Sequence, residues 1–384
     1  MTVTHAKGFR ASGVTAGLKA SGKPDVALVV NDGPHDIAAA VFTSNRIQAA
    51  PVQWSAEAAK SGTFKAVILN SGGANACTGA QGFANTAATA EHVGALLGVA
   101  AQDIAVCSTG LIGKQLPMDI LIPGVSAAHA ALSDNGGQDA ATAIMTTDSV
   151  AKTAECQCDE GWIIGGMAKG AGMLAPGLAT MLVVITTDAV IAQADLQRLL
   201  EKAVAESFNR IDSDGCMSTN DTVIAMSSGA SGIDANLEIF QSCLTGVCMS
   251  LARQLIADAE GATKDIKITV ANAASEADAV DVARAVSRSN LLKCAIHGED
   301  PNWGRVLSAL GTTSATFEPD LINVSFNGVA VCKNGACLAE EPVVDLSDRE
   351  VEILINLNAG SESAALWTND LTAMYVHENS AYST

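Results

Sequence analysis

The stretch from residue 169 to 189, KGAGMLAPGLATMLVVITTDA, joins a lysine and a glycine-rich loop to an apolar, β-branched segment. Thr180 lies at the junction, after Ala179. A threonine hydroxyl is a weak nucleophile unless a base takes its proton, and no Ser-His-Asp or Cys-His pattern offers one here. Cleavage of the Ala179–Thr180 bond would expose an α-amine with a pKa of about 7.7–8.0, which can serve as that base. The sequence permits this chemistry, and it equally permits Thr180 to be only the first residue of a buried strand.

A second segment with possible chemistry is CSTGLIG, residues 107–113. A strand that ends in Ser-Thr-Gly places hydroxyls beside closely spaced backbone N–H groups, and Gly110 lets the backbone approach a ligand. Such donors can stabilise the charge that develops on a carbonyl oxygen. The segment is therefore either an oxyanion hole or an ordinary turn.

Two other polar segments favour structural interpretations. NSGGANACTG, residues 70–79, lacks the glycine spacing of a phosphate or dinucleotide loop, which favours a tight loop beside a pocket. HGEDPNWGR, residues 297–305, is rich in turn formers. It predicts a structural turn with an Asp300–Arg305 ion pair and a hydrogen-bonded His297.

Composition limits the classes of partner. A net charge of −19, spread along 384 residues without an acidic tail, argues against nucleic acid and anionic membranes. The ten cysteines lack metal-ligand spacing, which predicts that most are small core residues in a reducing compartment. The N-terminal residues resemble no signal peptide, and no apolar run suggests a membrane span. We therefore expect a cytoplasmic protein.

The elements that must position these segments alternate unevenly between strands and helices. Strand patterns occur at 25–30, 37–44, 65–76, 103–113, 180–189, 265–273, 322–338 and 351–358, the second-last being a hairpin around Asn334-Gly335. Helical patterns occur at 86–98, 126–152, 194–211, 237–261 and 276–296. The mixture predicts an α/β fold of layered mixed sheets with flanking helices.

Taken together, the motifs resemble the ornithine acetyltransferase family of arginine biosynthesis, also called glutamate N-acetyltransferase. The motifs that carry the resemblance follow the family's order along nearly the whole chain: KGFRASGVTAGLK, NSGGANACTG, CSTGLIG, AIMTTDS, KGAGMLAPGLATMLVVITTDA, FNRIDSDGCMSTNDT, DAEGATK, GEDPNWGR and YVHENSAYST.

The resemblance implies that the precursor cuts itself between Ala179 and Thr180. An α chain of residues 1–179 and a β chain of residues 180–384 would stay assembled, share sheets around the active site, and form at least a pair of αβ units. Thr180 would be the nucleophile, with Thr109 and Gly110 as the oxyanion hole. The implied substrate-binding residues are Thr146, Lys169, Thr180, Glu260, Asn379 and Thr384.

The implied reaction is a double displacement in which Thr180 takes acetyl from N-acetylornithine and passes it to glutamate, with no metal or organic cofactor. Lys169 could bind a carboxylate and Glu260 an ammonium group. Acetyl-CoA is a further potential donor on which no residue decides. Three alternatives stay open: a self-processed amidohydrolase or aminopeptidase of related architecture, a non-catalytic binding protein, and an antibiotic-pathway relative.

The chain departs from the expected family pattern at two places. It reads Gly177-Leu178 where Asn-Met is expected before the scissile bond, and it has Ser71 and Gly73 where Ala and Asn are expected. The first difference loosens the backbone, which puts the rate of self-cleavage in question. The second could change the rim of the pocket.

Overall fold

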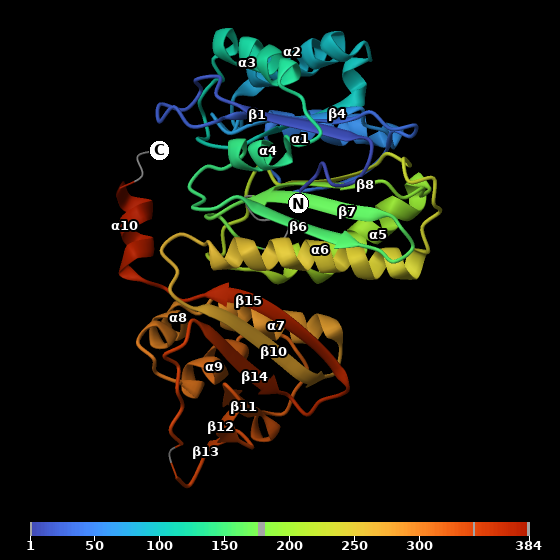
Figure 1. Cartoon of the computed structure of the whole chain (residues 1–384). Coiled ribbons are helices and arrows are strands. Elements are labelled where there is room, and N and C mark those ends of the chain that lie inside the picture. Colours follow the sequence, from blue (N-terminus) through green and yellow to red (C-terminus); the bar gives the residue numbers. More distant parts are fainter. Residues whose placement is uncertain (1, 176–180, 341, 382–384) are drawn as a thin grey trace. The chain divides into compact units, whose positions relative to one another are not determined.

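The computed structural model describes residues 2–175, 181–340 and 342–381. The chain divides into two compact units, which are described separately (Figure 1). The first contains residues up to 209 and residues 216–258, and the second contains residues 210–215 and 259–383. The predicted division into chains at residue 179 falls inside the first unit, and Ala179, Thr180 and Thr384 lie outside the described residues.

The first unit contains two stacked sheets. One sheet has the order β1 (Phe9–Val14), β2 (Val26–Asn31), β4 (Ala66–Asn70) and β5 (Ile104–Ser108). The other has the order β3 (Ile37–Phe42), β9 (Thr222–Ser227), β8 (Leu182–Thr187), β7 (Ile163–Lys169) and β6 (Lys152–Gln157). Only β4–β5 and β8–β9 pair in parallel among the strand pairs described in these sheets.

Side-chain alternation along β2 explains the layering. Every residue of this strand is buried. Leu28 belongs to a core that includes residues of α2 (Gly79–Leu97) and α3 (Met118–Ala130), whereas Val29 belongs to a core shared with β8 and β9. Because successive side chains of a strand point to opposite faces, β2 is covered by helices on one side and by the second sheet on the other.

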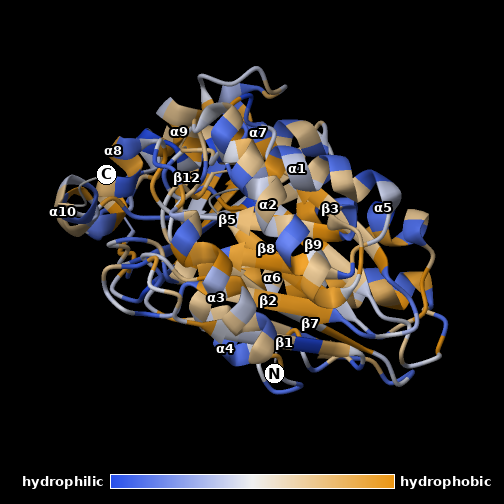
Figure 2. Cartoon of the chain, turned by 90° about the horizontal axis from the view of Figure 1, so that it is seen from above, coloured by the Kyte–Doolittle hydropathy of each residue, from blue (hydrophilic) through white to orange (hydrophobic). Residues whose placement is uncertain are grey.

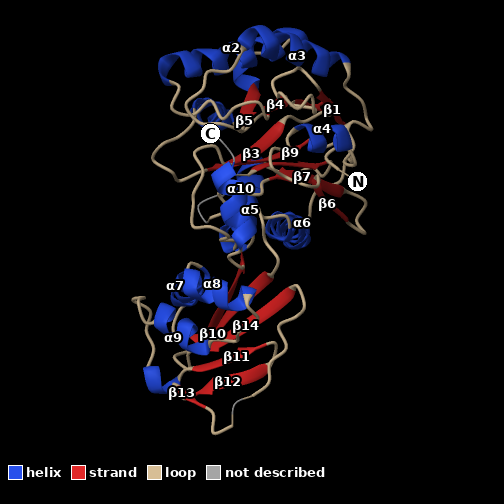
Figure 3. Cartoon of the chain, turned by 90° about the vertical axis from the view of Figure 1, so that its left-hand side faces the viewer, coloured by secondary structure: helices blue, strands red, loops and turns tan. Residues whose placement is uncertain are grey.

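Two helices cover the other face of the second sheet, α5 (Gln193–Glu206) and α6 (Leu237–Ala257) (Figure 3). The approach of α6 requires small residues on β7. A Cβ atom on Gly166 would lie 3.1 Å from Leu251 Cδ1 of α6, and one on Gly165 would lie 2.3 Å from the Thr2 carbonyl oxygen on the opposite face. The first unit is thus a four-layer helix–sheet–sheet–helix arrangement, and the predicted layered α/β fold is confirmed.

Hydropathy follows the layers: the central strands such as β2, β7 and β8 are hydrophobic, and the outer helices are mixed (Figure 2). Helix α6 is long and apolar enough to cross a membrane by length and composition alone. Its Leu244, Val247 and Leu251 are instead buried in the first unit. Two further helices complete the unit, α1 (Ala50–Ala58) and α4 (Gly137–Ala143).

The second unit is a six-stranded sheet with helices on one face. The strand order is β13 (Ala336–Cys337), β12 (Val329–Lys333), β11 (Asn323–Phe326), β14 (Glu350–Asn356), β10 (Asp265–Ala273) and β15 (Glu362–Asn369). The helices on this face are α7 (Glu276–Ser287), α8 (Asn290–His297) and α9 (Trp303–Leu310), and the exposed helix α10 (Ala373–Ala381) follows β15. Along β14 buried and exposed residues alternate, as expected for a sheet with one open face.

Two helix predictions need correction. The segment 126–152 is not one helix, because α3 ends at Ala130 and α4 spans only residues 137–143 after a loop. The segment 276–296 contains two helices, because Ser289 caps a new one: its hydroxyl accepts a hydrogen bond from the Leu292 N–H. The predicted hairpin turn is confirmed, since Asn334 and Gly335 both have positive φ between β12 and β13.

The prediction for the cysteines is wrong for most of them. Cys156 of β6 and Cys243 of α6 form a disulfide. Of the eight free cysteines, only Cys107, Cys248 and Cys332 are buried. Helix packing against β6 brings the bonded pair together across 87 residues, which spacing in the sequence does not indicate.

The turn at 297–305 also differs from its prediction. Arg305 donates to the Leu291 carbonyl, and Asp300 accepts from Asn302, so the predicted Asp300–Arg305 ion pair is not formed. His297 is hydrogen-bonded as expected, with its Nδ1 2.8 Å from Asp370 Oδ2.

Candidate active site

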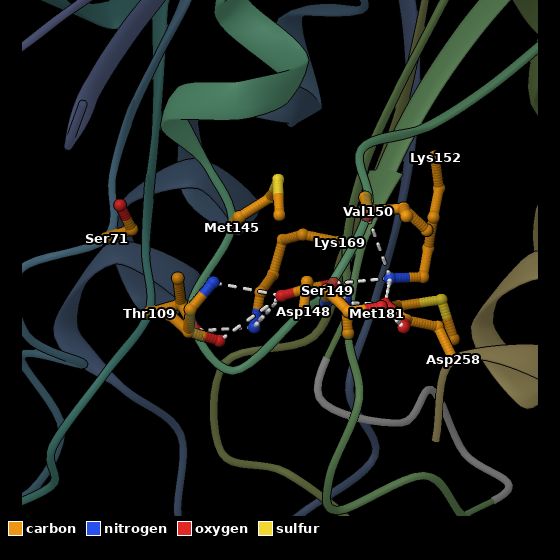
Figure 4. A network of polar contacts seen from close by, with 12 residues as sticks. Ser71, Thr109, Met145, Asp148, Ser149, Val150, Lys152, Lys169, Met181 and Asp258 are labelled. Carbon is orange, nitrogen blue, oxygen red and sulfur yellow. Dashed lines mark hydrogen bonds and ion pairs between the residues drawn. The ribbon is translucent and has the colours of Figure 1, made fainter. Parts of the chain in front are cut away.

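Two neighbouring strand ends in the first unit place Lys169 beside Thr109. Lys169 is the last residue of β7, and Thr109 directly follows β5. The lysine side chain is 1% exposed, and its ammonium donates to Thr109 Oγ1 over 3.3 Å (Figure 4). In the sheet Lys169 lies opposite Leu182 of β8, two residues beyond Thr180 in the sequence. A buried cation and a hydroxyl therefore meet next to the strand that follows the predicted nucleophile.

The loop after β5 is held tightly. The Thr109 N–H donates to the Asn70 carbonyl over 3.0 Å, and Gly110 has a φ of +132°. A Cβ atom at Gly110 would lie 2.9 Å from the backbone of Gly73, so only glycine fits this close approach. The side-chain amide of Asn220 joins this loop to the loop after β4, because it donates to the carbonyls of both Ser108 and Ala74. The backbone of this loop is thus fixed, and because the Thr109 N–H is already bonded to Asn70, the Thr109 hydroxyl is the group of this residue that can still donate.

Of the two atypical positions in the loop after β4, Ser71 has a structural role. Its hydroxyl is buried and donates to the Ala143 carbonyl at the end of α4 over 2.5 Å. Gly73 is the residue against which Gly110 packs. Gly73 therefore allows the close approach of the loop that presents Thr109, whereas Ser71 ties its own loop to α4.

Asp148 lies at the centre of a buried polar network that includes Lys169. Its Oδ1 accepts from Lys152 Nζ over 2.7 Å and from the Gly170 N–H over 2.6 Å. Its Oδ2 accepts from the Thr146 N–H over 2.9 Å and lies 3.9 Å from Lys169 Nζ. Lys152 in turn donates to Asp258 over 2.6 Å. These contacts connect the loop before β6 with the ends of β7 and α6.

Charge in this network is balanced inside the protein. Burial by itself would raise the pKa of Asp148, but the charges of Lys169 and Lys152 hold that pKa well below its usual value. Asp148 is therefore ionised at any physiological pH.

Burial lowers the pKa of Lys19 to about 8 despite Asp25, and the charge of Lys169 acts in the same direction as burial. Positive charge is thus concentrated around Lys169.

Asp221 binds the backbone where β8 begins. Its Oδ1 accepts from the Met181 N–H over 2.9 Å, and its Oδ2 has no hydrogen-bond partner among the described residues. The side chain is fully buried, which raises its pKa well above the usual value, and the hydrogen bond from Met181 and the charge of Lys169 only partly offset this. Asp221 thus fixes the backbone at the start of β8, and its burial disfavours the ionised form of its carboxyl group.

A separate cavity of about 280 Å³ lies within the second unit. Its charged lining residues are Asp214, Glu260, Arg288, Lys293 and Asp370. Burial lowers the pKa of Lys293 in spite of Asp212 and Asp214. At this cavity Glu260 Oε2 accepts from Asn379 Nδ2 of α10 over 3.1 Å. A pocket of this size with both signs of charge suits a small zwitterion.

Comparison with known proteins then settles the family. A family model described as ArgJ matches residues 10–384. The chain belongs to the ArgJ family. It is 62% identical over 383 residues to the arginine biosynthesis bifunctional protein ArgJ of Streptomyces coelicolor, and 59% identical over 384 residues to the protein of that name from Thermobifida fusca, with 100% of each chain covered. The predicted family is thereby confirmed.

Among solved structures, the chain resembles ornithine acetyltransferase from Mycobacterium tuberculosis in complex with ornithine. The sequences are 53% identical. The match covers 47% of this chain and 96% of that chain, with a TM-score of 0.45.

Of the site residues predicted for this ArgJ chain, Thr109, Gly110, Thr146 and Lys169 lie in the first unit, and Glu260 and Asn379 lie in the second. Thr180, Ala179 and Thr384 are outside the described residues. The structure brings Lys169 to Thr109 directly and to Thr146 through Asp148, and it brings Asn379 to Glu260.

Four acidic or basic groups of the first site were not predicted: Asp148, Lys152, Asp221 and Asp258. Three of them had a signal, because Asp148 ends the MTTD part of one family motif, Asp221 is the acid in STNDT, and Asp258 begins DAEGATK. Lys152 belongs to none of these motifs. Over the ranges that the structure describes, no group of three or more His, Cys, Asp and Glu side chains could hold a metal ion.

Proposed function

We propose that the chain is an acyltransferase of arginine biosynthesis that moves an acetyl group from N-acetylornithine to glutamate through Thr180. Membership of the ArgJ family supports this function, and so do relatives of matching length that are named for arginine biosynthesis. The observation that carries the site assignment is the buried Lys169–Thr109 pair beside β8.

The first chemical step is acylation of the nucleophile. After cleavage of the Ala179–Thr180 bond, the freed α-amine of Thr180 takes the proton of its hydroxyl. The Thr180 oxygen forms a bond to the acetyl carbon, the carbon–nitrogen bond of N-acetylornithine breaks, and the departing amine receives the proton. Thr109 and Gly110 stabilise the negative charge that develops on the acetyl oxygen.

The second step reverses the first with a different amine. The amine of glutamate attacks the acetyl-Thr180 ester, the ester carbon–oxygen bond breaks, and the threonine oxygen regains its proton. N-acetylglutamate leaves. Because both substrates carry a carboxylate, the buried ammonium of Lys169 can serve both half-reactions. Glu260 and Asn379 supply an acceptor and an amide that suit a substrate ammonium and carboxylate.

Denaturing intact-mass measurement tests the nucleophile. The purified protein should give two fragments that meet at Ala179 and Thr180. Incubation with N-acetylornithine alone should add one acetyl group to the C-terminal fragment, and glutamate should remove it. Thr180→Ala should stay a single chain. A wild-type chain that remains uncut after long incubation would overturn the assignment of Thr180.

The same sample separates transfer from hydrolysis. A transferase releases ornithine steadily only when glutamate is present, whereas an amidohydrolase of related architecture releases it at the same rate without glutamate. Steady release of ornithine that does not depend on glutamate would show that the protein is a hydrolase and not an acetyltransferase.

The relatives are called bifunctional proteins, which favours a second activity. We propose that acetyl-CoA also acylates Thr180, so that the enzyme makes N-acetylglutamate without N-acetylornithine. Release of free CoA that depends on glutamate, and is absent in Thr180→Ala, is the expected result. Unchanged acetyl-CoA would restrict the enzyme to N-acetylornithine.

The proposal includes an assembly of the two products of cleavage. Residues 1–179 and 180–384 contribute adjacent strands to the second sheet of the first unit, β7 before the cleavage site and β8 after it. We propose that they stay together and form at least a pair of αβ units in the cytoplasm. Light scattering on the native protein should give at least twice the mass of one αβ unit, and elution as separate fragments would contradict it.

A further inference from the structure

Asp148 contacts both of the predicted substrate-binding residues in the first unit. It accepts a hydrogen bond from the Thr146 N–H over 2.9 Å, and its other oxygen holds the Gly170 N–H, which follows Lys169, over 2.6 Å. The Lys169 ammonium lies 3.9 Å from Asp148 Oδ2, the oxygen that also binds Thr146. One carboxylate thereby fixes the backbone of Thr146 and of the residue next to Lys169, and it forms an ion pair with the lysine.

The two lysines share this carboxylate unequally. Lys152 is fully buried and bonds directly to Asp148 over 2.7 Å and to Asp258 over 2.6 Å. Lys169, at 3.9 Å, is outside hydrogen-bond range of Asp148 but within strong electrostatic range. Lys152 therefore holds the carboxylate in place through a direct hydrogen bond, while both lysines compensate its charge. Asp148 can favour a protonated Lys169 without competing for its hydrogen bonds.

We propose that Asp148 is a positioning residue that orients Lys169 and Thr146 for the carboxylate of the amino-acid substrate and keeps Lys169 protonated. This inference rests on the proposed acetyl transfer. It assigns to Lys152 a defined part as well, which is to hold Asp148 at a distance from Lys169. In this arrangement two buried lysines have different tasks, one for structure and one for the substrate (Figure 4).

The charged groups that act on Lys169 come from four elements. Asp148 precedes β6 and Lys152 begins it, Lys19 lies between β1 and β2, and Asp221 directly precedes β9. Burial disfavours the ionised form of Asp221, and Lys19 is itself a cation that repels Lys169. Asp148 is therefore the ionised carboxylate that acts most directly on Lys169 among these groups, and its removal should make Lys169 lose its proton at lower pH.

The test compares two variants of opposite expected sign, Asp148→Asn and Lys152→Met, by steady-state kinetics against pH on the processed enzyme. Asp148→Asn keeps the shape but removes the charge. We expect the KM for N-acetylornithine to rise about tenfold or more with kcat changed less than about threefold, and the rise of KM at alkaline pH to begin at lower pH than in wild type.

Lys152→Met should raise the pH at which KM begins to increase on the alkaline side, whereas Asp148→Asn should lower it. Without Lys152, the Asp148 charge acts on Lys169 alone, so Lys169 stays protonated to higher pH while a direct ion pair with Asp148 raises KM several-fold at neutral pH. Asp258→Asn, which removes one partner of Lys152 and leaves Asp148 in place, is the matched control. Its KM should stay within about threefold of wild type.

The outcomes separate the inference from the function on which it rests. Opposite pH shifts in the two variants support it. Unchanged KM and an unchanged pH profile, with only a lower melting temperature and a smaller active fraction, would mean that Asp148 is purely structural, and would overturn it. If the wild type fails to transfer acetyl in the same assay, the proposed function itself is wrong, and the inference falls with it.

Discussion

The Lys169 ammonium lies 3.3 Å from the Thr109 hydroxyl, although the two residues are 60 positions apart. They belong to different sheets of the first unit, Lys169 at the end of β7 and Thr109 just after β5. The contact joins the predicted carboxylate-binding lysine to the predicted oxyanion loop. Positioning of the substrate and stabilisation of charge can therefore be altered together by a change at either residue.

Replacement of Lys169 should chiefly weaken substrate binding. Lys169→Ala removes the buried cation, and a hydrogen bond to a charged group contributes about 1.5–3 kcal/mol, so the KM for N-acetylornithine should rise roughly 10- to 150-fold. Lys114→Ala, at an exposed lysine of the same unit, is the control and should behave as wild type. A wild-type KM in Lys169→Ala would contradict the carboxylate-binding role.

Asp221 predicts a pH dependence of stability. Its pKa in the folded chain is raised above the value of an unfolded aspartate, about 3.9, so the folded state binds the extra proton. Its stabilising contribution is complete below that unfolded value and is lost as pH rises through the folded value. Asp221→Asn keeps an acceptor for Met181 but cannot titrate.

The measurement for Asp221 is urea unfolding of both proteins between pH 4 and pH 9. As pH rises, the free energy of unfolding of the wild type should fall relative to that of Asp221→Asn, because only the wild type loses the contribution of a protonated carboxyl group. A difference that is constant over this range would show that the carboxyl group is not titrating differently on folding.

Local packing predicts opposite effects on stability for two glycine substitutions, one on β7 and one on α6. Gly165→Ala places a Cβ atom 2.3 Å from the Thr2 carbonyl oxygen, and overpacking of this kind costs about 1–3 kcal/mol. Gly246→Ala lies on α6 with no atom within 4 Å of the new Cβ, so its better helix propensity should stabilise by about 0.5–1 kcal/mol. Chemical denaturation of both variants checks this, and equal effects would contradict the packing argument.

The cavity of the second unit predicts a specific effect of Glu260→Gln. The amide can still accept a hydrogen bond from Asn379, but it has no charge for a substrate ammonium. We expect the KM for N-acetylornithine to rise about three- to tenfold with little loss of stability. Glu378→Gln, on the exposed side of α10, is the control. Equal KM values in the two variants would exclude Glu260 from substrate binding.

Much of the fold could be predicted from sequence, because the signals are local. Strand β10 was predicted with its observed bounds, and the buried stripe of α5, from Leu196 to Val204, follows from its 3.6-residue period. The boundaries that failed depended on short local features, such as the Ser289 cap that starts α8. The helical period of residues 237–261 places Ile239 on the apolar face of α6, but this residue is 40% exposed, because periodicity does not show where a neighbouring layer ends.

The sequence by itself determined the family, and through its motifs it predicted the site residues Thr109, Lys169 and Glu260. Only the tertiary structure decided which charges meet. Lys152 and Asp258 are 106 residues apart, and no motif links them, yet they bond inside the protein because α6 packs across β6 and β7. Burial then makes each such charge depend on a partner. That dependence is a property of the folded layers, and it makes Asp148 the centre of the network.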